Sequence, residues 1–569
     1  MTPVSRPKPV RWIVALLVTV LVVVTGVGLA MLAMGSRTTP ALGPTFLSPG
    51  TVAYMESRLD LPGDQRDNLI TFMGRFPGFA DPAAFDLKVN DTLDRLTREA
   101  SQDRYTYTGD IEPWFEGEFA LGVTELPDMS MDSGGLDGGR ESIPPFVGAL
   151  SVADRAALED FLARLRAEAP GATFTETSHD STTIVTYQPE SGPEQAFSYA
   201  VTDESLLFAL SPEHLVAALD VRSGAQPSLA DSALFQERFA SLPAERLGAV
   251  YLDLSGYRTL LEEGSDELDD STAEMLSDAL DQLPEAVAGS LRIEADRLVL
   301  DMLVSAGVDT PLPPSRSTSL AARMPSTSAF YAETRDVGEG ISKVVDGLVD
   351  SLGAPPAQLD QIEAFLGVPV EDFLLWIEDT AVSVAVDGDQ LTFGLAATVT
   401  DATVAAQRVE RLTTAIRAAS AFGEMPFTLG EEEIAGSLVT TIALKSPSTS
   451  LPDDMGFEPS LSYGIHEGMF YMGVGDFVSG AMQQSEAGSL AADPDYAMAL
   501  EAAGGATNSG VAYLDLAALR AFAEGLIPDE GRAEYDRDVR PYLEAFDRFI
   551  MSGSVTDGDM SLRALLYVE

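Results

Sequence analysis

From residue 46 to the C-terminus, the sequence contains an ordered series of segments that resemble one another in pairs. The clearest pair is 250–254 (VYLDL) and 512–516 (AYLDL). The other pairs are 46–54 with 323–331, 146–154 with 393–401, 197–210 with 461–474, and 288–304 with 552–568. Matches that keep their order over this length indicate an internal duplication. We therefore predict a first repeat over residues 46–310 and a second over 318–569, joined by a Pro- and Ser-rich linker at 311–317.

Within each copy, helical and strand patterns alternate. Residues 156–168 place Leu158, Phe161, Leu162 and Leu165 on one helix face, and residues 404–416 repeat this spacing. Residues 182–187, 205–210 and 298–304 have the β-branched and aliphatic composition of strands. The turns at 387–389 and 295–297 each separate two such runs and predict hairpins. Because hairpins imply antiparallel pairing, we predict an α+β fold of two tandem related domains, each an antiparallel sheet with packed helices.

Residues 12–34 form a run without a charged side chain, rich in Val and Leu. A helix of this length, at about 1.5 Å per residue, crosses a hydrocarbon core of about 30 Å. Arg6, Lys8 and Arg11 precede the run. The positive-inside rule therefore predicts a cytoplasmic tail at 1–11, a transmembrane anchor at 12–34, an extended extracytoplasmic spacer at 35–45, and an exported bulk. A cleaved signal peptide is the alternative, but the apolar run is long for that role and lacks a clear small-x-small cleavage site.

The charge of the chain restricts its partners. There are 35 basic and 89 acidic side chains, which gives a net charge of −54 at pH 7. A nucleic-acid partner is excluded because binding to phosphates requires a basic face. The absence of cysteine excludes disulfides, thiolate metal sites and cysteine nucleophiles. The expected partners are the lipid bilayer, through the N-terminal helix, and an unidentified protein or small ligand of cationic, neutral or apolar character.

The sequence lacks the usual signatures of catalysis. The three histidines, His179, His214 and His466, stand apart from one another, whereas a catalytic zinc typically needs three protein ligands. We interpret them as exposed polar positions. No Gly-x-Ser-x-Gly elbow, Ser-x-x-Lys motif or phosphate-binding loop occurs. We therefore predict no catalytic residues, no cofactor-binding residues, no metal ligands and no cofactor.

Acidic clusters alone do not define a site in so acidic a chain. Residues 266–270 (DELDD) could bind calcium, but they lack the glycine and the final glutamate of a calcium loop, so a solvated helix start is the preferred interpretation. Asp253 and Asp515 hold equivalent places in the two copies. They are either a functional pair or, more simply, caps between a strand and a helix. The Gly-rich residues 128–142 predict a loop.

Three short motifs lie between residues 61 and 123: Pro62-Gly63-Asp64-Gln65, Arg75-Phe76-Pro77-Gly78-Phe79, and Tyr107-x-x-Asp110-Ile111-x-Pro113-Trp114. Through them the chain resembles a bacterial family of membrane-anchored exported proteins that is catalogued as a domain of unknown function. The resemblance implies an N-terminal anchor and a duplicated extracytoplasmic domain, and it implies no activity. The motif at 75–79 predicts a helix end, and the third motif predicts a turn that packs Trp114 before a strand at 119–123. The second copy keeps a blurred version near Trp376 and Asp379.

Two hypotheses from different classes follow. The first is a non-catalytic envelope protein that binds or scaffolds a partner, with the interface between its two copies as the expected binding site. The second is an unrecognised exported hydrolase that uses a carboxylate pair. Glycoside chemistry would require two carboxylates facing one cleft at about 5–9.5 Å.

Overall fold

The computed structural model describes residues 41–59, 61–101, 103–124, 144–167, 172–188, 196–255, 258, 284–305, 312–338, 367–369, 371–388, 390–422, 427–444 and 460–569. The chain divides into two compact units, unit 1 up to Pro311 and unit 2 from Leu312. The predicted tail, the anchor at 12–34, the loop at 128–142 and the acidic segment at 266–270 lie outside the described residues. Within the described ranges, no helix is both long enough and apolar enough to cross a membrane.

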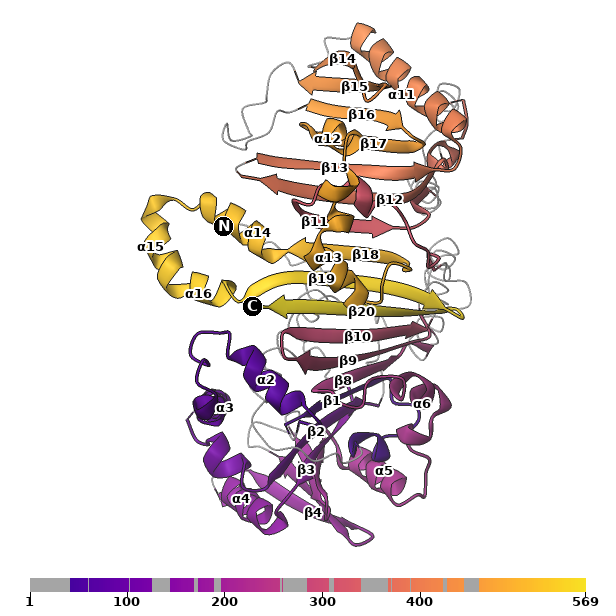
Figure 1. Ribbon diagram of the computed structural model, residues 1–569. Helices are drawn as coiled ribbons and strands as arrows, with labels where there is room; N and C mark the ends of the chain where they lie inside the picture. Colours follow the sequence, from indigo (N-terminus) through magenta and orange to yellow (C-terminus); the bar gives the residue numbers. More distant parts are fainter. Residues whose placement is uncertain are drawn as a thin grey trace, which may run out of the picture. The chain divides into compact units, whose positions relative to one another are not determined.

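Unit 1 combines an antiparallel sheet with helices (Figure 1). Its strands are β1 (Ala53–Arg58), β2 (Phe115–Val123), β3 (Phe146–Val152), β4 (Thr173–His179), β5 (Thr182–Gln188), β6 (Phe197–Val201), β7 (Ser205–Ala209), β8 (Gly248–Asp253), β9 (Ala286–Glu294) and β10 (Arg297–Ser305). Its helices are α2 (Gln65–Met73), α3 (Phe85–Ser101), α4 (Arg155–Ala167), α5 (Pro212–Arg222) and α6 (Ala233–Phe239), with a 3-10 turn η1 (Gly43–Thr45) and a π-helical turn η3 (Tyr107–Ile111). The antiparallel pairs give the order β4-β5-β6-β7-β3-β2-β1-β8-β9-β10.

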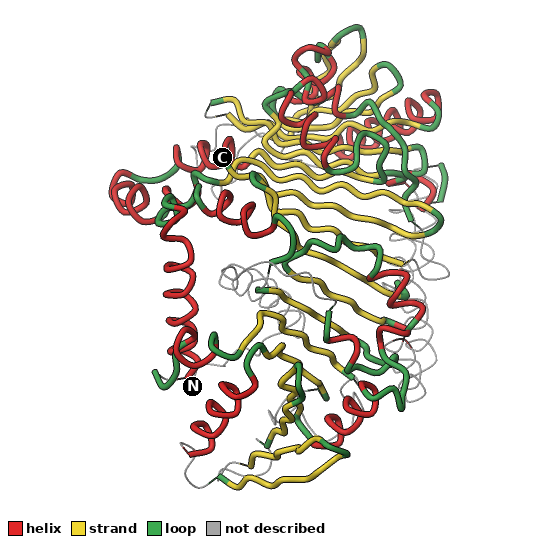
Figure 2. Tube along the Cα trace, turned by 60° about the horizontal axis from the view of Figure 1, so that its bottom comes forward, coloured by secondary structure: helices red, strands yellow, loops and turns green. Residues whose placement is uncertain are grey.

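Unit 2 has the same two kinds of element. Its strands are β11 (Ser328–Thr334), β12 (Ile377–Asp387), β13 (Gln390–Val399), β14 (Phe427–Ile434), β15 (Ser437–Leu444), β16 (Ser460–His466), β17 (Met469–Val474), β18 (Gly510–Asp515), β19 (Phe546–Thr556) and β20 (Asp559–Val568). Its helices are α11 (Ala402–Phe422), α12 (Phe477–Met482), α13 (Pro494–Ala502), α14 (Leu516–Gly525), α15 (Asp529–Asp538) and α16 (Arg540–Leu543). Antiparallel pairing gives β14-β15-β16-β17-β13-β12-β11-β18-β19-β20. Figure 2 shows the strands of each unit as successive adjacent traces with helices beside them.

The strand orders of the two units correspond position by position, and so do their registers. Tyr54 of β1 pairs with Tyr251 of β8, and Tyr331 of β11 pairs with Tyr513 of β18. These tyrosines are almost fully buried. They meet an aromatic ring of α6 in unit 1 and of α13 in unit 2, because Phe235 contacts Tyr54 and Tyr251 edge-on, as Tyr496 contacts Tyr331 and Tyr513. The aromatic cluster at the centre of each unit is therefore built in the same way.

The local predictions from sequence periodicity are confirmed. The stripe at 156–168 forms α4, in which Leu158 and Phe161 are buried, and the stripe at 404–416 forms part of α11. The hairpin predicted at 387–389 is present, with Gly388 following the last residue of β12 and β13 paired antiparallel to β12, and residues 295 and 296 join β9 to β10. Gly388 has φ +60°, a left-handed conformation that glycine adopts without strain. The α+β class with antiparallel sheets is likewise as predicted.

Residues assigned to the spacer and to the linker are built into the units. Instead of extending freely, Gly43–Thr45 forms η1, in which Gly43 and Pro44 are buried. In unit 2, Arg316 forms a β-bridge with Asn508, so the end of the proposed linker is part of the folded unit. Proline and serine content alone did not indicate these contacts, because both partners lie far away in the sequence.

Candidate functional site

A polar groove of about 700 Å³ lies on unit 1, between α4 and the strands β4, β5 and β6. Its volume falls within the range of about 300–1,000 Å³ that is usual for small-molecule sites. Helix α4 supplies Arg155, Glu159 and Arg166, because these charged residues lie along one flank of the helix, beside its buried stripe of Leu158 and Phe161. Figure 1 shows α4 beside β4. The groove is thus a product of the amphipathic helix.

Two guanidinium groups are fixed in the groove by partners on different elements. Arg155 donates from Nε to Glu159 Oε1 at 2.9 Å and from Nη1 to Asp203 Oδ1 at 2.7 Å. Arg166 donates from Nε to the Tyr199 hydroxyl at 2.7 Å and from Nη1 to Glu176 Oε1 at 2.9 Å. Each arginine therefore ties α4 to the sheet side of the groove.

These contacts also set the protonation of the arginines. Hydrogen bonding to Glu159, and then to Asp203, raises the pKa of Arg155 above its ordinary value. Partial burial alone would lower the pKa of Arg166, but hydrogen bonds to Tyr199 and Glu176 outweigh burial and raise it. Both groups are permanent cations at physiological pH. The groove accordingly holds two fixed cations, each next to a carboxylate.

Unit 2 lacks these cations at the corresponding positions. Asp154 caps α4 by accepting from Ala156 and Ala157, and Asp401 caps α11 by accepting from Thr403 and Val404. Counted from these caps, the residues that correspond to Arg155 and Arg166 are Ala402 and Thr413. The Thr413 hydroxyl lies 3.0 Å from the hydroxyl of Tyr463, which takes the place of Tyr199. The link to the tyrosine is kept. The ion pair of Arg166 with Glu176 also has a counterpart in unit 2, one helical turn further along α11, where Arg417 pairs with Glu431. The cation at position 155, in contrast, is replaced by Ala402.

Each unit also contains a buried polar network on its first strand. In unit 1 the Tyr54 hydroxyl donates to Glu56 at 2.8 Å, and Arg246 donates to the same carboxylate at 2.8 Å. Glu118 lies on β2, opposite Arg58 of β1. Its carboxylate accepts a hydrogen bond from the backbone N–H of Leu42 at 2.6 Å, and the residue is 4% exposed. Burial raises the pKa of Glu118 to about 7, although the backbone hydrogen bond and the charge of Arg58 oppose this. The network attaches the segment around η1 to the sheet.

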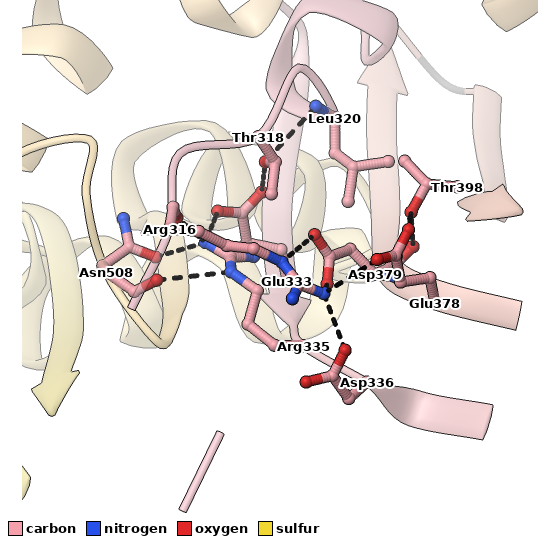
Figure 3. A network of polar contacts seen from close by, with 10 residues as sticks. All are labelled: Arg316, Thr318, Leu320, Glu333, Arg335, Asp336, Glu378, Asp379, Thr398 and Asn508. Atoms are coloured by element: carbon pink, nitrogen blue, oxygen red, sulfur yellow. Dashed lines mark hydrogen bonds and ion pairs between the residues drawn. The ribbon is translucent and has the colours of Figure 1, made fainter. Parts of the chain in front are cut away.

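The network of unit 2 has the same plan with different partners (Figure 3). The Tyr331 hydroxyl donates to Glu333, and Arg335 donates to Glu333 at 2.9 Å and to Asn508 Oδ1 at 2.6 Å. Asp379 on β12 accepts from Arg316 Nε at 2.9 Å. Its backbone N–H donates to Thr398, as that of Glu118 donates to Ser151. Both networks are buried within their sheets and join an N-terminal segment to them.

This second set of residues was missed in the sequence. The paired segments were matched only as far as Tyr54 and Tyr331, yet the pattern Tyr-x-Glu-x-Arg continues through residues 54–58 and 331–335. Alternating positions of a strand share one face, so this spacing places all three side chains on one side of the sheet. The pattern places these three side chains of each unit together, whereas their partners Arg246 and Asn508 lie far away in the sequence.

The histidines are half-buried rather than exposed, which corrects the expectation from sequence. His179 Nε2 lies 2.8 Å from Asp220, His214 Nδ1 lies 2.8 Å from the Ser211 hydroxyl, and His466 Nδ1 lies 3.1 Å from the Ser437 hydroxyl. Imidazole packs in these positions because each ring has a nearby polar partner. The structure does not bring the three histidines together.

Asp253 and Asp515 behave as capping residues. Asp515 Oδ1 accepts from the backbone N–H of Ala518 at 2.7 Å and caps α14. Asp253 accepts from the backbone N–H of Ser255 at 3.0 Å. Burial raises the pKa of Asp515. In the described ranges, no group of three or more His, Asp or Glu side chains is placed to hold a metal ion.

The motifs at 62–65 and 107–114 serve the packing of unit 1. The Gln65 amide donates to the carbonyl of Ile293 at 3.1 Å and accepts from its N–H at 2.8 Å, which fixes α2 to β9. Trp114 is 2% exposed, donates from Nε1 to the Asp110 carbonyl at 2.8 Å and stacks on Phe161. Trp376 is also buried, directly before β12. The interpretation of these aromatic residues as structural is confirmed.

Fold and site together define an α+β protein with antiparallel sheets, buried polar networks and a polar groove on unit 1. The chain belongs to the family described as Protein of unknown function (DUF3352), whose profile matches residues 85–566. No curated protein matches the sequence. Solved structures similar to this chain include crystal forms III and I of TP0453, at 10% and 7% identity, each with a TM-score of 0.23 over 48% of this chain and 82% of that one. At these TM-scores the likeness supports no inference about function.

Proposed function

We propose that this protein is a non-catalytic binding or scaffolding protein of the bacterial cell envelope, anchored by residues 12–34 with its C-terminal bulk outside the membrane. The charge-free N-terminal run and the basic residues before it support the anchor. The acidic bulk, with a net charge of −54 for the chain, supports export and excludes nucleic acid as the partner. The ligand site that we propose is the groove of unit 1.

The observation that carries this proposal is the pairing of charges in the groove. Glu159 and Asp203 are bound to Arg155, and Glu176 is bound to Arg166. Each of these carboxylates accepts a hydrogen bond from one of the two guanidinium groups, so its position in the groove is fixed by the protein. An arrangement of fixed donors and acceptors is suited to holding a ligand in one orientation. It therefore favours binding over turnover.

The alternative, a hydrolase with a carboxylate pair, requires two carboxylates that a substrate can reach. Glu56 and Glu118 are two carboxylates on adjacent strands, but each is 4% exposed and neither lines the groove. A substrate could not reach them without opening the sheet. Among the described residues, the carboxylates that line the groove and that a substrate could contact are Glu159, Glu176 and Asp203.

We further propose that the two units are copies of one ancestral domain. The shared strand order, the paired tyrosines and the repeated Tyr-x-Glu-x-Arg pattern support a duplication. An experimental structure should superpose Tyr251 on Tyr513 and Leu210 near Val474. Placement of these residues on unrelated elements would contradict the duplication. Binding at the interface between the copies stays a prediction from the sequence.

Two experiments test the function. Cross-linking and pull-down of the native protein from its membrane should recover a specific partner or ligand. A screen of the full chain against glycoside, ester and peptide substrates should show no turnover. Turnover that disappears in Glu159→Gln, Glu176→Gln or Asp203→Asn, with folding retained, would replace the binding function with catalysis.

A further inference from the structure

We propose that the groove of unit 1 binds a neutral, hydroxyl-rich ligand, an oligosaccharide. The inference rests on the binding function proposed above and adds the chemical class of the ligand. It is argued from the donors and acceptors of the groove, from its charge, and from the comparison with unit 2.

The groove offers donors and acceptors side by side. A guanidinium has five N–H donors, and the contacts of Arg155 with Glu159 and Asp203 involve two of them. Each of those carboxylates has a second oxygen that can accept. A sugar hydroxyl both donates and accepts, so one hydroxyl can bridge a guanidinium and its carboxylate. The same holds at Arg166, at the other end of α4, and its partner Glu176 on β4.

Hydroxyl groups of the protein continue this pattern. Ser181, Thr182 and Thr183, at the turn between β4 and β5, line the groove. Leu162 and Ala163 contribute apolar surface, against which the C–H faces of a sugar ring could pack. The lining is thus polar at several separate points, which suits an extended ligand with many hydroxyls.

The charge of the groove disfavours ionic ligands of either sign. Three carboxylates, Glu159, Glu176 and Asp203, surround two guanidiniums, so an anion would face a net negative site on a chain of net charge −54. A cation would have to approach Arg155 and Arg166 and compete for carboxylates that they already hold. A neutral polar ligand meets neither penalty.

Comparison of the units shows that the fold does not require the charge of Arg155. Unit 2 builds the same helix and strands with Ala402 and Thr413 in place of Arg155 and Arg166. Thr413 preserves the contact with the tyrosine of the neighbouring strand. The ion pair of Arg166 has a counterpart in Arg417 and Glu431, so it is Arg155, replaced by Ala402 in unit 2, that is better explained by a ligand than by stability.

The test uses this difference. The Arg155→Ala/Arg166→Thr variant gives unit 1 the residues of unit 2 at these positions, and Thr at 166 can keep its contact with Tyr199. Arg222→Ala removes another arginine of unit 1, paired with Glu204 outside the groove, and is the matched control. Arg155→Ala alone serves as a second variant, because its side chain is 48% exposed and its loss should not disturb folding.

The full chain in detergent is titrated calorimetrically with maltohexaose and chitotetraose as neutral probes, oligogalacturonate as the anionic probe and chitosan oligomers as the cationic probe. A neutral probe should bind, with Kd at least tenfold higher in the double variant and unchanged in Arg222→Ala. Tighter binding of a charged probe that the double variant abolishes would overturn the ligand class and leave the groove as a binding site. Absence of binding by both neutral probes, or binding that the double variant does not weaken, would overturn the inference, and the pull-down would then decide the proposed function independently.

Discussion

Replacing Glu118 by glutamine removes a charge that unit 1 buries and keeps the shape of the side chain. Glu118 is 4% exposed, and its Oε1 accepts the backbone N–H groups of Leu42 at 2.6 Å and Gly43 at 3.4 Å. A glutamine carbonyl can accept both hydrogen bonds. The substitution therefore isolates the cost of burying the negative charge.

The magnitude follows from the pKa. Burial raises the pKa of Glu118 from 4.5 to about 7, with the nearby charge of Glu56 adding to the rise. One pKa unit corresponds to about 1.4 kcal/mol, so the difference amounts to about 3 kcal/mol in the free energy of unfolding. Because the folded state holds the proton more tightly, this stability is fully present below pH 4.5 and is lost as the pH rises to about 7.

We therefore expect Glu118→Gln to be more stable than the wild type at pH 8, by up to about 3 kcal/mol, and to differ little from it at pH 4.5. Urea unfolding at several pH values measures this, with Trp114 as the reporter of unit 1 in a Trp12→Phe/Trp376→Phe background. General repulsion among the acidic side chains also depends on pH, but it acts on both proteins and cancels in the difference.

Asp379→Asn is the matched control, because Asp379 holds the corresponding position of unit 2 and accepts from Arg316 at 2.9 Å. Loss of this charge-assisted hydrogen bond should lower the free energy of unfolding of unit 2, which is the opposite of the effect expected for Glu118→Gln in unit 1. The reasoning is refuted if Glu118→Gln is less stable than the wild type at pH 8, or if its advantage does not change between pH 4.5 and 8.

Three further predictions concern stability and topology. Trp114→Ala should lower the free energy of unfolding by about 3–5 kcal/mol, because it empties a buried site and removes the stacking on Phe161, and chemical denaturation measures this loss. Asp154→Ala should lower the free energy of unfolding by about 1 kcal/mol, because it removes the cap of α4. Asp160→Ala on the same helix is the control, and an equal loss of stability in both variants would contradict the capping role. The protein should stay in the membrane fraction. When the outer layers of the cell are permeabilised and the cytoplasmic membrane is left intact, added protease should cleave the residues beyond 40. Protection there and cleavage only after lysis would reverse the predicted orientation.

Local sequence patterns predicted the elements of the fold well, because their causes lie within a few residues. The hairpin between β12 and β13 depends on a turn with Gly388, and α4 depends on the spacing of Leu158 and Phe161. The α+β class followed from these elements. Strand order could not be derived in the same way, because it depends on contacts between distant segments.

The polar networks and the groove show what local patterns omit. Arg246 is 190 residues from its partner Glu56, and Arg335 is 173 residues from Asn508. Arg166 meets Tyr199, 33 residues away, only because the sheet returns beside α4. Charged residues on a helix face look like a solvated surface in the sequence, so nothing local distinguished the groove. The half-buried histidines were misjudged for the same reason.

Comparison of the two units separates residues that build the fold from residues that serve one unit alone. Tyr54, Glu56 and Arg58 recur as Tyr331, Glu333 and Arg335, in the same register and buried in both sheets. Glu333 pairs with Arg335 in unit 2, and Glu56 pairs with Arg246 in unit 1. Removing one partner of such a buried charged pair costs about 3–5 kcal/mol, so either copy would be impaired by the loss.

Unit 2 has Ala402 and Thr413 at the positions of Arg155 and Arg166, and the ion pair of Arg166 has its counterpart there in Arg417 with Glu431. Of Arg155 and Arg166, it is therefore Arg155 that sets unit 1 apart. Both are partly exposed and bound to exposed carboxylates, and surface pairs of this kind contribute at most about 1 kcal/mol. A contribution of that size gives little reason to keep two arginines in a groove. Contact with a ligand would give such a reason, and for this reason the groove of unit 1, rather than either buried network, is where the function of the protein should be sought.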